Sequence, residues 1–74
     1  PQIDQERSIR DDKKKLEQAK KRLSDLDVII SRLYEDYVLG NLSQDRYKKI
    51  AADYEAEQER LKLEIEVIEE WVEQ

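Results

Sequence analysis

The sequence predicts an all-α fold in which two long helices form an antiparallel coiled-coil hairpin, with its turn at about residues 40–43. Apolar residues recur with heptad spacing on both sides of the only glycine, Gly40. Residues that end one helix and begin another also occur there in the right order. Charged residues make up 45% of the 74-residue chain, a composition that suits a solvated helical rod better than a globule with an interior.

The turn is predicted from four residues around the glycine. Gly40 can adopt the left-handed conformation that ends a helix without a Cβ penalty, and Asn41 tolerates similar backbone angles. Ser43 can cap the following helix, and Asp45 then lies in its positively charged first turn. One continuous helix is the alternative, since glycine costs only about 1 kcal/mol inside a helix. The paired signals favour a turn.

We therefore expect one domain with helices at about residues 5–39 and 44–73. Residues 1–8 show no sustained apolar period, and we expect a frayed lead-in there. The first helix carries alternating steps of three and four at Ile9, Asp12, Leu16, Ala19, Leu23, Leu26, Ile30, Leu33 and Tyr37. The second carries them at Tyr47, Ala51, Tyr54, Gln58, Leu61, Ile65, Ile68 and Val72.

Folding these two stripes antiparallel about Leu42 brings them together layer by layer. Facing residues are those whose numbers add to 84, so Tyr37 meets Tyr47 at the turn and Leu23 meets Leu61 further along. Every layer places an a position against a d position, as antiparallel knobs-into-holes packing requires. The poorest layer is the last one, at the open end of the hairpin, where Asp12 faces Val72.

Charge favours the same pairing. Residues 7–22 carry eight Lys and Arg against three acids, whereas residues 53–74 carry nine acids against two basic residues. An antiparallel fold lays the basic segment beside the acidic one. The expected flanking pairs are Arg22 with Glu64 and Lys13 with Glu69, and mild repulsion is expected for Asp27/Glu55 and Lys20/Lys62.

Composition argues against catalysis by this segment. The chain has no Cys and no His, so it offers no thiol nucleophile, imidazole base, disulfide or ordinary zinc site. The acids of the second helix surround it, with no His beside them. We expect no enzyme activity, no metal and no cofactor. The start at Pro1 rather than Met suggests an excised piece of a longer protein.

Partners are restricted by charge and hydropathy. The net charge of −5 argues against nucleic acid as the main partner, and the basic clusters are expected to be a solvated face balanced by the acidic helix. No apolar run approaches the ~20 residues that span a bilayer, so no membrane is expected. Trp71 is either an anchor for a neighbouring domain or a shield for the open end.

The hairpin tip is the candidate site. Its apolar residues lie off the heptad seam and cluster within one turn of the loop: Tyr34, Val38, Leu39 and Leu42. Several such residues together at a loop tip indicate a contact surface for a partner. In the alternative, Leu39 and Leu42 fold back to cover the last layer of the seam.

The residues around the turn resemble those of a known family. The run Leu33-Tyr-Glu-Asp-Tyr-Val-Leu-Gly-Asn-Leu-Ser-Gln-Asp-Arg-Tyr47, followed by Tyr54-Glu-Ala-Glu-Gln58 and Leu61, is similar to the coiled-coil region of large serine recombinases. These are the integrases and transposases of phages and mobile elements in Gram-positive bacteria. The resemblance extends over about residues 12–72.

The resemblance implies a protein–protein interaction arm in a site-specific DNA recombinase. The tip residues Tyr34, Val38, Leu39 and Leu42 would contact the same motif in another subunit, helping to choose which sites synapse and the direction of DNA integration. A directionality factor is a second candidate partner. The implied location is the bacterial cytoplasm, with no direct DNA contact from this segment. The family's catalytic serine and zinc ligands lie outside it.

Two other classes of function stay open. The hairpin could be a generic coiled-coil oligomerisation or spacer module whose tip has no specific contact. It could also be a nucleic-acid-reading arm like that of some tRNA synthetases. Mutation of the tip separates the first from the recombinase arm, and a DNA- or RNA-binding assay separates the second.

Overall fold

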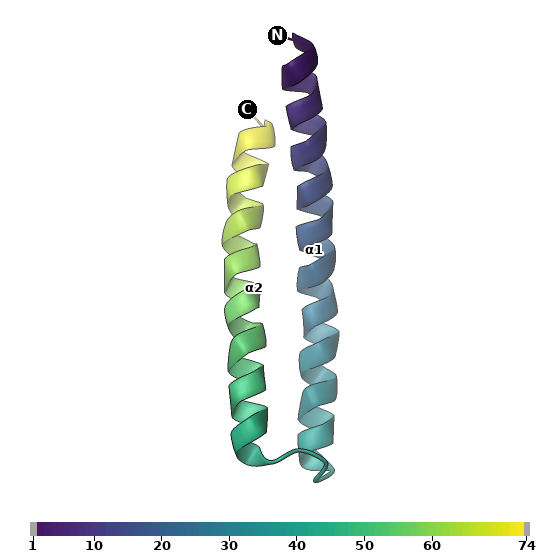
Figure 1. The fold of residues 1–74 in the computed structure, drawn as a ribbon, viewed down its shortest axis with the longest axis vertical. Coiled ribbons are helices and arrows are strands. Elements are labelled where there is room, and N and C mark those ends of the chain that lie inside the picture. The colour runs from purple at the N-terminus through teal and green to yellow at the C-terminus, as the bar shows by residue number, and fades with distance from the viewer. Residues whose placement is uncertain (1, 74) are drawn as a thin grey trace.

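The protein is a helical hairpin made of two antiparallel helices, as the sequence predicts (Figure 1). The computed structural model describes residues 2–73, with side chains described for residues 5–72. Helix α1 spans Gln2–Val38 and helix α2 spans Gln44–Glu73. The Cα trace extends 57 × 15 × 14 Å. The molecule is therefore a rod with a closed tip at the turn and an open end where both termini lie.

The first helix begins earlier than its apolar pattern suggests. Because α1 is helical from Gln2, the expectation of a frayed lead-in is wrong for residues 2–8. Gln5, Glu6 and Arg7 are good helix formers, and no glycine or proline occurs from residue 2 to residue 39. Regularly spaced apolar residues indicate where a helix packs against a partner. Residues 2–8 of α1 are helical through helix propensity alone, beyond the part of the helix that packs.

A Schellman motif ends α1. Gly40 has φ +81°, the left-handed conformation that the sequence predicts. The N–H of Asn41 donates to the carbonyl of Asp36 (2.9 Å), and the N–H of Gly40 donates to the carbonyl of Tyr37 (3.1 Å). These two bonds satisfy carbonyls that the end of a helix would otherwise leave without a donor. The chain turns away from the helix axis at Gly40 as a result.

Ser43 begins α2 as its N-cap. The Ser43 Oγ accepts a hydrogen bond from the N–H of Arg46 (3.2 Å), and the Ser43 carbonyl accepts the first helical bond, from the N–H of Tyr47 (2.9 Å). Asp45 lies in the first turn, where the helix dipole favours a carboxylate. The predicted cap is therefore confirmed, and the turn consists of residues 39–43.

The core is the predicted a/d seam. Leu26 is fully buried, and the other buried side chains are Ala19, Ala51 and Ile65. All the remaining predicted seam positions are half-buried except Ile9, which is 39% exposed at the open end. Small residues therefore lie buried where they face large ones, as at Ala19 and Ile65.

The flanking ion pairs differ from the expected ones. Arg22 forms two hydrogen bonds with Glu57, through Nε to Oε2 (2.7 Å) and through Nη2 to Oε1 (3.1 Å). Lys20 Nζ lies 3.3 Å from Glu69 Oε2. The predicted pairs of Arg22 with Glu64 and of Lys13 with Glu69 are therefore wrong. A residue beside an antiparallel seam lies between two residues of the facing helix that are one heptad apart, and it can pair with either. In both cases the observed pair differs from the predicted one by one heptad: Arg22 pairs with Glu57 rather than Glu64, and Glu69 pairs with Lys20 rather than Lys13.

The same choice removes the expected repulsions. Lys20 leans toward Glu69 rather than Lys62, and Lys62 pairs with Glu59 on its own helix (3.3 Å). Asp27 does not oppose Glu55 alone, because its Oδ1 accepts a hydrogen bond from Gln58 Nε2 (2.7 Å). Gln58, the polar seam residue of α2, is thus hydrogen-bonded to the facing helix.

Candidate partner-binding site at the hairpin tip

Three of the four predicted tip residues share one exposed surface. Tyr34, Val38 and Leu39 are 48%, 63% and 73% exposed. Together with Glu35 they line a shallow groove on the α1 side of the tip. Leu42 is half-buried and does not line this groove. The structure therefore brings together Tyr34, Val38 and Leu39, which we call the tip surface, and places Leu42 apart from it.

Helical spacing and the end of α1 build this surface. Tyr34 and Val38 are four residues apart, so their side chains lie on the same face of the last turn. Leu39 follows directly, and its N–H still bonds to the carbonyl of Glu35 (2.9 Å). Because Gly40 then redirects the chain, no further helical turn covers these three side chains.

An aromatic cluster closes the seam beneath the tip surface. The rings of Tyr37 and Tyr47 stack with centroids 4.6 Å apart and an interplanar angle of 10°. Tyr34 meets Tyr47 edge-on, at 6.2 Å and 81°. Leu39 does not fold back over this layer, since it is 73% exposed. The alternative expectation is that Leu39 and Leu42 cover the last layer of the seam. Of these two residues, only Leu42 is half-buried.

The cluster also fixes one wall of the tip groove. Edge-to-face aromatic pairs contribute about 0.5–1.5 kcal/mol beyond the area they bury. Contact with Tyr47 therefore restricts the ring of Tyr34 while leaving it 48% exposed. A partially held, exposed aromatic ring is a suitable anchor for a partner, because little side-chain freedom remains to be lost on binding.

The strongest electrostatic feature lies in the middle of the rod. The bidentate hydrogen bonding from Arg22 lowers the pKa of Glu57 below its usual range, and the same bonding raises the pKa of Arg22. Both groups stay ionised at neutral pH, so the pair is a structural contact across the seam. Neither group has the pKa near 7 that acid–base catalysis favours.

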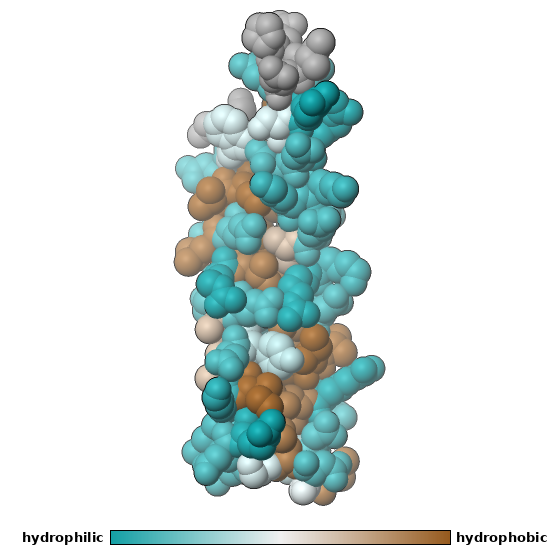
Figure 2. All heavy atoms as spheres, viewed as in Figure 1, coloured by the Kyte–Doolittle hydropathy of each residue, from teal (hydrophilic) through white to brown (hydrophobic). Residues whose placement is uncertain are grey.

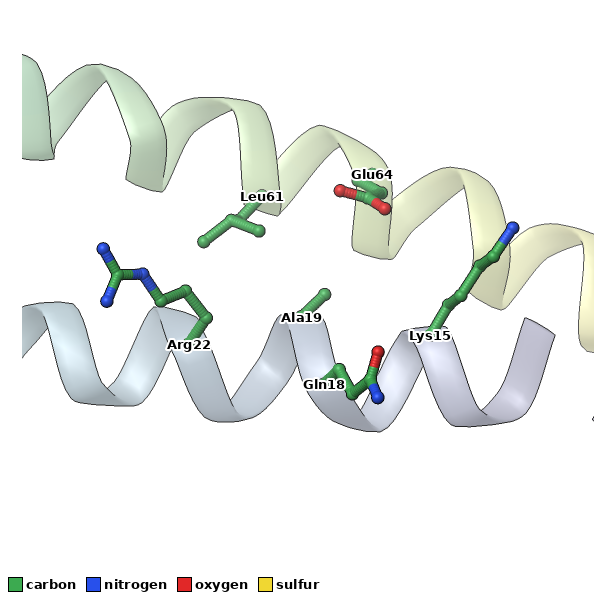
Figure 3. Close-up of a pocket in the computed structure, with 6 residues that line it drawn as sticks. All are labelled: Lys15, Gln18, Ala19, Arg22, Leu61 and Glu64. Carbon is green, nitrogen blue, oxygen red and sulfur yellow. The ribbon is translucent and has the colours of Figure 1, made fainter. Parts of the chain in front are cut away.

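A hollow beside this pair results from a small seam residue. It lies over Ala19 and Leu61 and is rimmed by Lys15, Gln18, Arg22 and Glu64 (Figure 3). Figure 3 shows the Arg22 and Lys15 side chains pointing in opposite directions along the groove. Neither forms an ion pair with Glu64 in the part of the chain described. The hollow holds no group of converging polar side chains that would bind a small molecule.

A second exposed apolar surface lies on α2 and was missed by the heptad analysis. Leu63, Val67 and Trp71 are 63%, 66% and 57% exposed and are spaced four residues apart. We call them the α2 ridge. Figure 2 shows apolar surface along the outer side of α2 in the half nearer the open end. The four-residue spacing was visible in the sequence, but analysis of a and d positions alone does not detect it.

Trp71 also borders a groove at the open end. The groove is lined by Gln5, Ser8, Ile9, Trp71 and Val72, so it lies between the start of α1 and the end of α2. The indole is 57% exposed there. Trp71 therefore covers part of the open end and leaves the rest of its indole in solvent.

The described residues offer neither a metal-binding cluster nor a membrane-spanning helix. Among residues with described placement, no group of three or more His, Cys, Asp or Glu side chains is arranged to hold a metal ion. Neither α1 nor α2, over its described length, has an apolar stretch long enough to cross a membrane.

Comparisons with known proteins give no relative. No family model matches the sequence, no curated protein matches it, and no solved structure matches the fold. The resemblance to large serine recombinases therefore stays a prediction.

Proposed function

We propose that this hairpin is a protein–protein interaction arm that contacts a second copy of itself through its tip. The observation that carries the proposal is the tip surface, where Tyr34, Val38 and Leu39 are exposed side by side. Several large apolar side chains gathered at one place mark an interaction site, whereas single exposed ones need no explanation. Position adds to this, because the tip lies at the far end of a rod 57 Å long.

The contact is small and reversible. Three side chains at the end of a rod 15 Å wide cannot bury the area of a permanent interface. An interface below about 1,200 Å² is typical of weak, transient encounters. An arm that must meet another arm and later release it needs such a contact.

In finer detail, we assign the arm to a site-specific DNA recombinase of the large serine class. The resembling run, Leu33 to Tyr47, contains all four predicted tip residues, the Gly40 stop and the Ser43 cap. The partner is then the same motif in another recombinase subunit, or a directionality factor. The arm acts in synapsis and in the direction of integration, in the bacterial cytoplasm and without touching DNA itself.

A spacer without tip contacts is the second candidate. The observation that favours it is the Tyr37–Tyr47 stack, which closes the seam without a partner, together with the half-buried Leu42. On this reading the exposed tip side chains remain in water. Self-association separates the two functions.

Sedimentation of the purified chain tests the tip contact. We expect the wild type to form a dimer as its concentration rises toward millimolar, and the double variant Val38→Ser, Leu39→Ser to remain monomeric. Val28→Ser is the matched control, since Val28 is 51% exposed on α1 but lies away from the tip. A monomeric wild type, or a tip variant that associates as well as the wild type, leaves only the spacer.

The recombinase assignment has its own test. The coding sequence adjoining this segment should encode a serine-nucleophile catalytic domain and a zinc-binding module. If neither is encoded there, the recombinase assignment is wrong, whatever the sedimentation result.

A further inference from the structure

The α2 ridge is an apolar surface separate from the tip. Leu63, Val67 and Trp71 lie along one i, i+4, i+8 row, which runs about 12 Å at a rise of 1.5 Å per residue. Rows of this spacing form the ridges that interlock in the commonest class of helix–helix packing, with axes crossing at about −50°. All three side chains are more than half exposed, so α1 does not cover them.

Charges on both sides of the ridge indicate the chemistry of what covers it. By helical spacing, Glu66 and Glu70 lie along one side of the ridge, and Arg60 and Glu64 lie along the other. Among the described residues, none of these three carboxylates forms an ion pair. The surface beside the ridge is therefore net negative, with carboxylates available to a cationic partner.

A second copy of this chain fits the ridge poorly. Pairing two α2 ridges brings six of these carboxylates together, which is unfavourable at neutral pH. The basic half of α1, residues 7–22, has the right charge, but its only exposed large apolar side chain is Ile9. A second copy thus offers either apolar contact or charge complementarity at the ridge, and not both.

We propose that the α2 ridge binds a basic amphipathic helix of another protein segment. The partner helix supplies an apolar row of about three turns, which packs against Leu63, Val67 and Trp71. Lysine or arginine residues beside that row pair with Glu64, Glu66 and Glu70. The hairpin then has two surfaces, a tip for a second copy and a ridge for a different, basic partner.

Trp71 supplies the measurement, because it is the only tryptophan in the chain. The probe is a synthetic Leu/Lys helix of about four turns with leucine at i, i+4 and i+8. The same peptide with Glu in place of Lys is the charge control. We expect the Lys peptide alone to blue-shift the Trp71 emission, and the shift to weaken as salt is raised from about 0.05 to 0.5 M.

Variants locate the binding. Leu63→Ser, Val67→Ser should lower the affinity for the Lys peptide at least about tenfold, since two apolar contacts are lost. Val38→Ser, Leu39→Ser should leave it unchanged. Glu66→Lys, Glu70→Lys should reverse the preference, so that the Glu peptide binds better. All the substituted side chains are exposed, so we expect the variants to keep the hairpin fold.

Three results would overturn the proposal. The first is equal binding of the Lys and Glu peptides to the wild type, and the second is full binding to the Leu63→Ser, Val67→Ser variant. The third is self-association of the wild type that this variant abolishes and the tip variant does not, because a second copy would then occupy the ridge. The first two results leave the tip contact untouched, whereas the third also counts against it, because the tip variant would then still associate.

Discussion

The tip and the open end of the hairpin hold the same two helices together by different means. At the tip, residues 39–43 join the helices covalently, the Schellman bonds and the Ser43 cap satisfy the backbone, and Tyr37 stacks on Tyr47. At the open end Asp12 and Val72 are only half-buried, and Ile9 is 39% exposed. The tip is therefore the end of the hairpin where the two helices are held by more kinds of contact.

The largest effect on stability should come from removing an aromatic side chain at the tip, and it is compared with the removal of one side chain at the open end. Tyr47→Ala deletes the ring that contacts both Tyr37 and Tyr34, and we expect it to lower the free energy of unfolding by about 2–4 kcal/mol. Val72→Ala at the open end should cost under about 1 kcal/mol. Thermal unfolding followed by circular dichroism measures both. Equal losses would mean that the tip is not the more strongly held end.

The left-handed residue at the tip should come next. Gly40→Ala meets no neighbouring atom within 4 Å, so any loss comes from the backbone conformation at φ +81°. We expect a loss of about 1–2 kcal/mol, and a smaller loss for Gly40→Asn, because asparagine visits this conformation more readily. Urea titration of the three proteins gives the order. An alanine variant as stable as the wild type would contradict the Schellman geometry.

The cap of α2 should have a smaller effect. Ser43→Ala removes the acceptor for the Arg46 N–H and should cost about 1 kcal/mol. Ser31→Ala is the matched control, because the Ser31 hydroxyl only donates back to the Asp27 carbonyl within α1 (2.9 Å). Since alanine is the better helix former there, that control should be neutral or slightly stabilising. The melting temperatures of the two variants compare them directly.

The smallest effect on stability should come from the Arg22–Glu57 ion pair, which lies midway along the rod. Because the pKa of Glu57 is lowered in the folded chain, its contribution is present above the unfolded pKa of about 4.3 and is lost as pH falls through the folded pKa. Glu57→Gln should therefore lower the melting temperature at pH 7, and the difference from wild type should shrink as the pH falls below about 4.3. Glu66→Gln is the control for the loss of one carboxylate from α2, because Glu66 forms no ion pair among the described residues.

The seam and the caps could be predicted because each depends on local chemistry or on a strict period. Leu26 and Ile65 follow from heptad spacing, and Gly40 and Ser43 follow from backbone requirements that few residues meet. The start of α1 was misplaced since its first residues have propensity but no facing partner. A period cannot report on a helix that continues past its seam.

The flanks and the site were harder, because the sequence leaves two choices of similar energy. Arg22 could reach Glu57 or Glu64, one heptad apart, and heptad spacing alone does not indicate that the partner is Glu57. Leu42 could not be separated from Leu39 in advance, since its exposure depends on the path of the turn. The α2 ridge has a clear spacing, but its exposed residues lie off the seam, so the pairing of the two helices does not reveal it.

The positive φ of Gly40 also makes the hairpin sensitive to chirality at one backbone position. A D-amino acid prefers the mirror-image region in which this residue already lies, at φ +81°. D-alanine at position 40 should therefore stabilise the fold by about 0.4–1 kcal/mol, by removing conformations from the unfolded chain only. At 74 residues the chain is accessible to chemical synthesis. The two alanine enantiomers would then move its stability in opposite directions from glycine.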